Sequence, residues 1–138
     1  MTVTHHLELT VLPRRYAIFR LPPHEQASFV WPKPCAGVGF VSVTHTRDEL
    51  SGVCEEAGLP ANITAQRGRR LFRVNGPLDF SLTGILASLT SPLAEAGVSI
   101  FAISTYDTDY LLLAEEDLDV AIPALERAGH TIHRSETE

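Results

Sequence analysis

Three segments of the 138-residue chain end in an alanine–glycine pair, and each pair precedes a stretch rich in β-branched residues. These endings are Glu56-Ala57-Gly58, Glu95-Ala96-Gly97 and Arg127-Ala128-Gly129. A glycine just after the last apolar-periodic residue is typical of a helix C-terminus, because glycine takes the left-handed cap conformation without a Cβ penalty. The sequence therefore predicts that helices alternate with strands, and it starts the first of these helices at Asp48.

The second half of the chain predicts a complete fold. Runs of β-branched, aromatic and leucine residues predict strands at Leu7–Val11, Arg15–Arg20, Gly39–Thr44, Arg70–Asn75, Val98–Ser104 and Tyr110–Leu113, with shorter ones at Ile63–Ala65 and Thr131–His133. From Arg70 onward the order is β-α-β-β-α-β, which is typical of one antiparallel sheet with two helices on one face.

Residues 1–66 read as an incomplete version of the same order, in which the proline-rich stretch Leu21–Ala36 stands where a first helix would be. We expect Trp31, within that stretch, to be at least half buried. The prediction is an α+β protein with two domains, residues 1–66 and residues 67–138.

The charge distribution bears on partners. The chain has 11 Lys and Arg against 17 Asp and Glu, a net charge of −6, and residues 71–138 alone carry 3 basic and 11 acidic side chains. This balance argues against nucleic acid, which attracts clustered basic residues, and the one such cluster, Arg67-Gly68-Arg69-Arg70, is interpreted as a solvated turn between strands. No apolar stretch approaches the ~20 residues of a membrane span, so we expect a cytoplasmic protein in which Cys35 and Cys54 are reduced thiols.

Catalytic motifs are missing from the sequence. Gly37-Val38-Gly39 lacks the third glycine of a dinucleotide-binding loop, and neither a Gly-x-Ser-x-Gly elbow nor a phosphate-loop lysine occurs. The six histidines lack the spacing of a zinc site, and a calcium loop starting at Asp107 fails because Leu111 stands where an oxygen ligand is required. We therefore expect no enzyme activity, no cofactor and no metal.

Polar side chains are densest between two apolar strands, in the hairpin Ser104–Tyr110. Asp109 starts a strand there beside Thr105 and Tyr106, so a carboxylate, a hydroxyl and an aromatic ring can converge on a cationic or zwitterionic ligand. Asp107 is interpreted as a turn residue that accepts backbone hydrogen bonds. A purely structural turn is the alternative for the whole hairpin.

Four segments carry a resemblance to a known family. The segments Gly76–Gly84, Ser91–Ile100, Ser104–Leu113 and Phe40–Cys54 resemble small bacterial ACT-domain proteins that are related to the animal cytosolic arginine sensors. The resemblance covers about residues 5–133. It implies tandem ferredoxin-like ACT domains, the second complete and the first partly degenerate, without catalytic activity, and an amino acid bound between two ACT units, with a homodimer supplying the facing unit.

The resemblance also implies a set of site residues. Ser99 and Ile100 of one unit would meet the backbone groups of the amino acid. Thr105, Tyr106 and Asp109 of the other unit would hold its side chain, and Gly84 and Ile85 would line the wall. Leu82 stands where the arginine sensors place a ligand-facing acid, and this departure argues against arginine as the ligand.

Two hypotheses follow from the sequence. The first is a regulatory module that binds an amino acid and acts on an enzyme partner; the loop Asn75–Ser81 favours it, because the helix N-terminus that follows can accept a carboxylate. The second is an interaction domain that uses its sheet edges only for oligomerisation or for docking on an enzyme.

Overall fold

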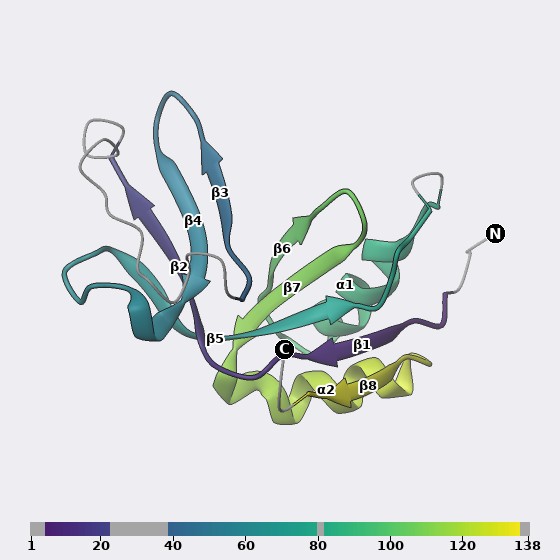
Figure 1. The fold of residues 1–138 in the computed structure, drawn as a ribbon. Coiled ribbons are helices and arrows are strands. Elements are labelled where there is room, and N and C mark those ends of the chain that lie inside the picture. Colours follow the sequence, from purple (N-terminus) through teal and green to yellow (C-terminus); the bar gives the residue numbers. More distant parts are fainter. Residues whose placement is uncertain (1–4, 23–38, 80–81, 136–138) are drawn as a thin grey trace. The chain divides into compact units, whose positions relative to one another are not determined.

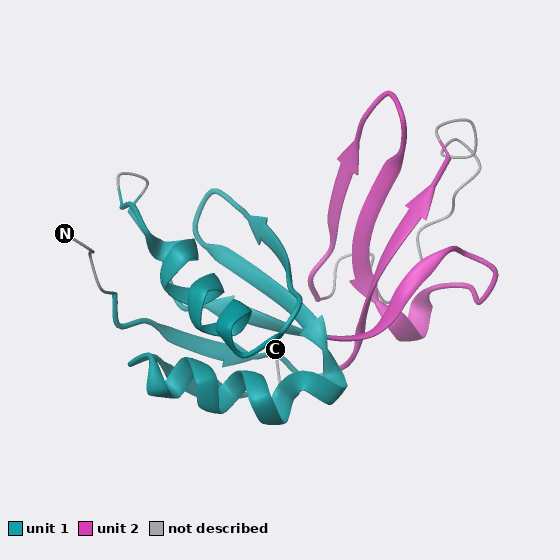
Figure 2. Ribbon diagram, turned by 180° about the vertical axis from the view of Figure 1, so that it is seen from behind, with its two compact units in different colours: residues 1–13, 70–138 teal, residues 14–69 magenta. Residues whose placement is uncertain are grey.

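The computed structural model describes residues 5–22, 39–79 and 82–135. By their contacts the residues form two compact units (Figure 2). Unit 1 consists of residues 1–13 and 70–138, and unit 2 consists of residues 14–69. The first strand thus belongs by its contacts to the unit built mainly from the C-terminal half, and the division into domains 1–66 and 67–138 stays a prediction.

Unit 1 contains the predicted β-α-β-β-α-β order (Figure 1). Its elements are β1 (Glu8–Val11), the second half of β5 (Ala65–Val74), α1 (Ile85–Glu95), β6 (Phe101–Ser104), β7 (Asp109–Ala114), the 3-10 turn η4 (Glu115–Asp117), α2 (Leu118–Arg127) and β8 (Thr131–Arg134). Within this unit the strands lie in the order β6-β7-β5-β1-β8. The predicted α+β class is confirmed.

The prediction of an all-antiparallel sheet is wrong at one place. β1 lies between β5 and β8; it runs antiparallel to β5, pairing Leu9 with Val74, and parallel to β8, pairing Leu9 with Ile132. The sheet of unit 1 is therefore mixed. The order of elements alone would place β5 and β8 side by side, but β1, from the start of the chain, lies between them.

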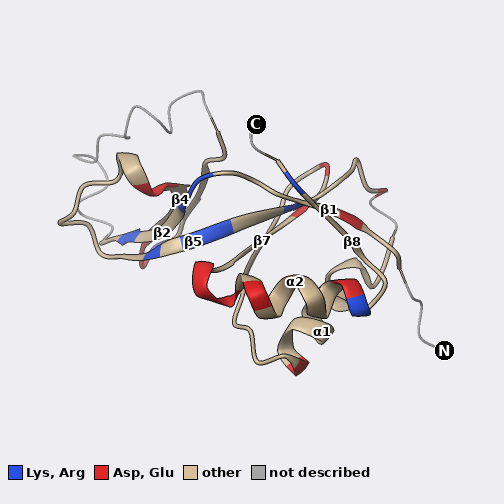
Figure 3. Cartoon of the chain, turned by 90° about the horizontal axis from the view of Figure 1, so that it is seen from below, with Lys and Arg blue, Asp and Glu red and all other residues tan. Residues whose placement is uncertain are grey.

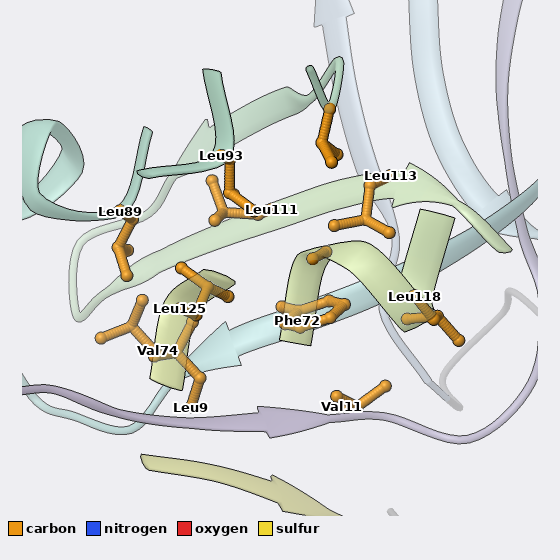
Figure 4. Packing of buried hydrophobic residues seen from close by; sticks show 12 residues of the cluster. Leu9, Val11, Phe72, Val74, Leu89, Leu93, Leu111, Leu113, Leu118 and Leu125 are labelled. Carbon is orange, nitrogen blue, oxygen red and sulfur yellow. The ribbon is translucent and has the colours of Figure 1, made fainter. Parts of the chain in front are cut away.

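One core holds unit 1 together, and alternate strand residues build it. Successive side chains of a strand point to opposite faces, so alternate residues can share one core. The core of unit 1 contains such residues of three strands: Leu9 and Val11 of β1, Phe72 and Val74 of β5, and Leu111 and Leu113 of β7 (Figure 4). Leu89 and Leu93 of α1 and Leu118 and Leu125 of α2 meet them there. The two helices therefore cover one face of the sheet, as the sequence predicts.

The two helices of unit 1 end as predicted. Gly97 and Gly129 follow α1 and α2 with φ of 78° and 100°, in the left-handed region that an alanine enters only with strain. The Val98 N–H donates to the carbonyl of Leu93, and the His130 N–H donates to that of Leu125, so the last turns are closed by backbone hydrogen bonds. The alanine–glycine signal is thus a true helix ending at two of its three occurrences.

The remaining occurrence, Glu56-Ala57-Gly58, does not end a helix, and the predicted helix from Asp48 to Gly58 is wrong. Unit 2 contains β2 (Tyr16–Leu21), β3 (Ser42–His45), β4 (Leu50–Glu55), the 3-10 turn η3 (Glu56–Gly58) and the first half of β5. β4 pairs residue by residue with β2, from Tyr16 with Glu55 to Leu21 with Leu50. The Thr46 hydroxyl oxygen accepts the N–H groups of Asp48 and Glu49, each at 3.1 Å. A threonine can accept such hydrogen bonds at the start of a helix, but here they close the turn between β3 and β4.

The interpretation of Arg67–Arg70 as a turn between two strands is also wrong. These residues lie inside β5, along which several basic residues are spaced (Figure 3). Gly68 has a φ of 68°, and the pairing of β2 with β5 shifts register between Tyr16 and Ile18. A glycine bulge therefore lets one long strand continue through the segment.

Some expectations concern residues that the structure does not describe. Trp31, Cys35 and most of the proline-rich stretch Leu21–Ala36 lie outside the described residues. Among the described residues, Cys54 is buried and is not part of a disulfide. In the part of the chain that is described, no helix is long and apolar enough to cross a membrane.

We predict that Gly52→Ala destabilises unit 2. A Cβ at position 52 would clash with Cζ of Phe19, whose side chain is only 1% exposed and has little room to move. Overpacking of this kind costs about 1–3 kcal/mol of unfolding free energy, measurable by urea denaturation. Ser51→Ala, one residue earlier and partly exposed, is the matched control, and equal midpoints for the two variants would contradict the prediction.

Candidate functional site

The hairpin between β6 and β7 is closed by a compact network of threonine contacts. The Thr105 N–H donates to the carbonyl of Thr108 at 2.8 Å, and the Thr105 hydroxyl oxygen accepts the Thr108 N–H at 3.3 Å. Because residues 105 and 108 form a hydrogen-bonded pair, Ser104 and Asp109 form the next, non-hydrogen-bonded pair, whose side chains lie close together. The turn thus fixes where these polar side chains stand.

Two hydrogen bonds tie this hairpin to the segment that follows β5. The Leu78 N–H donates to the carbonyl of Asp107 at 2.7 Å. The Thr108 hydroxyl, which is 8% exposed, donates to the carbonyl of Val74 at 2.6 Å. The hairpin and the start of the β5–α1 loop are therefore held in one arrangement.

A hollow of about 190 Å³ lies between the loop, the start of α1 and the hairpin. The residues that line it are Leu78, Asp79, Leu82, Ile85, Ser104, Thr105, Tyr106, Asp107, Thr108 and Asp109. Three of them carry carboxylates, and none of the described lining residues is a lysine or an arginine. We call this place the acidic hollow; its charge suits a cationic group of a ligand.

The carboxylate of Asp109 is held in place by its neighbour. The Ser104 hydroxyl donates to Oδ1 of Asp109 at 2.6 Å. Asp109, the first residue of β7, is partly buried, and the strand is buried from Leu111 to Ala114. A carboxylate oriented in this way can accept a charge-assisted hydrogen bond from an ammonium or guanidinium group.

The structure brings four of the predicted site residues together. Thr105, Tyr106, Asp109 and Ile85 all line the acidic hollow. Gly84, the N-cap of α1 with a φ of 78°, is next to Ile85 in the chain but is not among the lining residues. Tyr106 is 81% exposed, so its ring is open to a molecule that binds there.

The other two predicted residues lie elsewhere. Ser99 and Ile100 precede β6, whereas the hairpin follows it. At about 3.3 Å per strand residue, Ile100 and Thr105 are roughly 16 Å apart along the chain direction. One copy of the chain therefore does not bring these two groups together, and their role in a site stays a prediction.

Several residues that line the acidic hollow were not predicted from the sequence. Asp79 and Leu78 come from the β5–α1 loop, and only the fold places them opposite the hairpin. Leu82, noted as a departure from the family pattern, lines the hollow and is 46% exposed. Asp107 lies in the predicted turn and also lines the hollow; among the described residues its backbone carbonyl, rather than its carboxylate, accepts a hydrogen bond.

The described part of the chain holds no cluster of three or more His, Cys, Asp or Glu side chains that could bind a metal ion. The hollow's chemistry is that of carboxylates, hydroxyls, one phenol ring and apolar side chains. These groups can bind and orient a small polar molecule.

Comparisons with known proteins agree with this fold. The ACT domain family model matches residues 64–127, and a model of an N-terminal domain matches residues 14–62. The crystal structure of protein Atu0741 from Agrobacterium tumefaciens is 36% identical, covers 98% of both chains and superposes with a TM-score of 0.85. The α+β fold and these matches define a protein that contains an ACT domain. The chain belongs to the ACT-domain family and is distantly related to the animal arginine sensors.

Two further relatives show how far the likeness extends. The cytosolic arginine sensor for mTORC1 subunit 1 of Bos taurus is 33% identical over an alignment of 99 residues, and the alignment covers 64% of this chain. The chain spans only 30% of that sensor's own length. An allosteric aspartate kinase from Clostridium acetobutylicum is 15% identical and shares the fold over 84% of this chain and 33% of the kinase, with a TM-score of 0.61.

Proposed function

We propose that this protein is a non-catalytic, cytoplasmic regulatory protein that binds an amino acid in the acidic hollow, at an interface between the ACT units of a homodimer. The observation that carries the proposal is the joint presence of Asp79, Asp107 and Asp109 around one hollow. Every amino acid carries an ammonium group, and these carboxylates supply the opposite charge. The arginine sensor among the relatives is a binder of an amino acid by its name, which supports the same ligand class.

The size of the hollow supports an interface site. Small-molecule sites usually enclose about 300–1,000 Å³, whereas the acidic hollow encloses about 190 Å³. Its lining comes entirely from unit 1. A second copy that covers the open side would supply the rest of the walls, and Ser99 and Ile100 are the groups that the family resemblance assigns to this task.

The edge of β6 offers a way for the second copy to bind. Among the described strands, β6 pairs only with β7, and Phe101 on it is 38% exposed. Because hydrogen-bonded and non-hydrogen-bonded pairs alternate from Thr105 and Thr108, the backbone N–H groups of Ala102 and Ser104 point away from β7. An open edge of this kind pairs readily with another strand.

A two-fold axis through Ala102 would join two β6 strands in antiparallel register. Ser99 of one copy would then lie opposite Thr105 of the other, and Ile100 opposite Ser104. The residues that one copy holds about 16 Å apart would meet across the interface. We therefore propose that dimerisation through β6 completes two equivalent amino-acid sites.

The variant Asp109→Asn tests the site. The amide keeps the shape and an acceptor for the Ser104 hydroxyl, but it removes the charge that the ligand's cation would meet. Loss of a charge-assisted hydrogen bond weakens binding by about 1.5–3 kcal/mol, which is roughly 10- to 150-fold in the dissociation constant. Titration calorimetry, with the amino acid that stabilises the native protein most, measures the change.

Glu116→Gln is the matched control for this experiment. Glu116 is an exposed carboxylate of η4 outside the lining of the acidic hollow, so we expect its dissociation constant to equal that of the native protein. Asp107→Asn is unsuitable as a control because Asp107 lines the hollow. If Asp109→Asn bound as tightly as Glu116→Gln, the proposed site would be wrong.

The second candidate is an interaction domain that docks on an enzyme. The open edge of β6 with the exposed Phe101 favours it, and it requires no ligand. It becomes the better account if none of the twenty amino acids binds the native protein while the dimer or an enzyme complex still depends on β6.

A further inference from the structure

A second hollow lies at the same end of the β5–β7 pair and encloses about 460 Å³. Of the described lining residues, it shares Asp107 and Thr108 with the acidic hollow. Arg73 and Asn75 at the end of β5 and Tyr110 of β7 contribute its other polar walls. We call it the arginine hollow; its volume lies within the usual range of about 300–1,000 Å³ for small-molecule sites.

The two hollows lie on different sides of the strands. Phe72, Val74 and Leu111 point into the core beneath the helices, and side chains alternate along a strand. Arg73 and Tyr110 therefore point to the face that α1 and α2 do not cover. Between the hollows, the hydrogen bond from the Leu78 N–H to the Asp107 carbonyl joins the loop to the hairpin.

The donors in the arginine hollow suit a carboxylate. Arg73 is partly buried, and within the described residues its guanidinium has neither a hydrogen bond nor an ion pair. Asn75 accepts the Thr10 hydroxyl through Oδ1 at 2.8 Å, which leaves its amide N–H groups to donate elsewhere. A guanidinium presents a planar fork of N–H donors that matches a carboxylate in two parallel hydrogen bonds.

The arginine hollow also contains a negative charge, which indicates what kind of ligand it would bind. Asp107 faces this hollow as well, and within the described residues no hydrogen bond or ion pair engages its carboxylate. One positive and one negative side chain in one hollow match a small molecule that carries both charges. In contrast, the charged residues of the acidic hollow are all carboxylates.

We propose that the arginine hollow is a second binding site, for a small zwitterion whose carboxylate lies on Arg73 and Asn75 and whose ammonium group lies near Asp107. The site is complete in one copy of the chain, and it does not depend on the function proposed above. Because Asp107 and Thr108 belong to both hollows, a ligand in one borders the residues that bind a ligand in the other.

Three simple probes test the charge requirement. Glycine carries both charges, acetate carries only the carboxylate, and methylammonium carries only the cation. The Nε–H resonance of Arg73 is followed in ¹⁵N-labelled protein at constant ionic strength, in the native chain and in Asp109→Asn, which removes one carboxylate from the acidic hollow and none from the arginine hollow. We expect glycine to shift this resonance saturably in both proteins, acetate to bind about tenfold more weakly, and methylammonium to leave it unchanged.

Arg73→Gln and the matched control Arg127→Gln complete the experiment. Arg127 is an exposed arginine at the end of α2, outside both hollows. We expect Arg73→Gln to abolish the glycine-induced shifts of the Asn75 and Tyr110 backbone amides, Arg73→Lys to retain them in part, and Arg127→Gln to leave them intact. The proposal is overturned if acetate binds as tightly as glycine, if the shifts persist in Arg73→Gln, or if they vanish in Asp109→Asn.

Discussion

Replacing Phe72 by alanine should lower the unfolding free energy of the protein by about 3–5 kcal/mol, the usual cost of removing a buried aromatic ring. Phe72 is fully buried at the centre of the unit 1 core, where β1, β5, β7 and both helices meet (Figure 4). A strand or helix that moved in to fill the space left by the ring would lose its contacts with the other elements of the core. Urea denaturation followed by circular dichroism measures the change, and the slope of the transition should stay the same.

Val120→Ala is the control for this substitution. Val120 lies on α2 but is 47% exposed, so the loss should stay within about 0.5 kcal/mol. A Phe72→Ala protein that is as stable as Val120→Ala would mean that the packing of unit 1 differs from the one described.

The second large effect concerns the open edge of β6. Ala102→Pro should convert the proposed dimer to a monomer and, at the same time, remove amino-acid binding to the acidic hollow. Proline lacks the backbone N–H that Ala102 would give to a second copy. The same substitution removes no hydrogen bond to β7, because Ala102 and Leu111 form a non-hydrogen-bonded pair.

Ala102→Val is the matched variant, because it keeps the N–H and suits a strand. Light scattering at tens of micromolar should show a dimer for the native protein and for Ala102→Val, and a monomer for Ala102→Pro. A native protein that is monomeric with and without amino acids would contradict the interface, and a monomeric Ala102→Pro that still binds the ligand normally would contradict a shared site.

The helices and strands of unit 1 could be predicted because their signals are local. Gly97 and Gly129 end helices whose apolar stripes precede them, and the strand order follows from Arg70 onward. The position of β1 between β5 and β8 could not be predicted, because pairing partners lie more than sixty residues away along the chain. The error at Asp48–Gly58 has the same origin: β4 is a strand because β2 pairs with it along its whole length.

In the candidate site, too, residues close in the sequence could be predicted and residues brought together by the fold could not. Thr105, Tyr106 and Asp109 are close in sequence, so their clustering and the family resemblance were enough to select them. Asp79 and Arg73 stand alone in the sequence, and only the folded arrangement of β5, its following loop and the hairpin brings each of them to a hollow with Asp107. Charged residues that meet only after folding have no fixed spacing in the sequence, so no sequence motif could identify them.

A thermal-unfolding screen of the native protein against the twenty amino acids tests the central claim most directly. At about 100 times its dissociation constant, a ligand that binds only the folded state adds roughly 2.7 kcal/mol to the stability. We predict that at least one amino acid raises the melting temperature in this saturable way, and that Asp109→Asn loses most of this increase at the same ligand concentration while Glu116→Gln keeps it. A native protein whose melting temperature responds to none of the twenty would contradict the account.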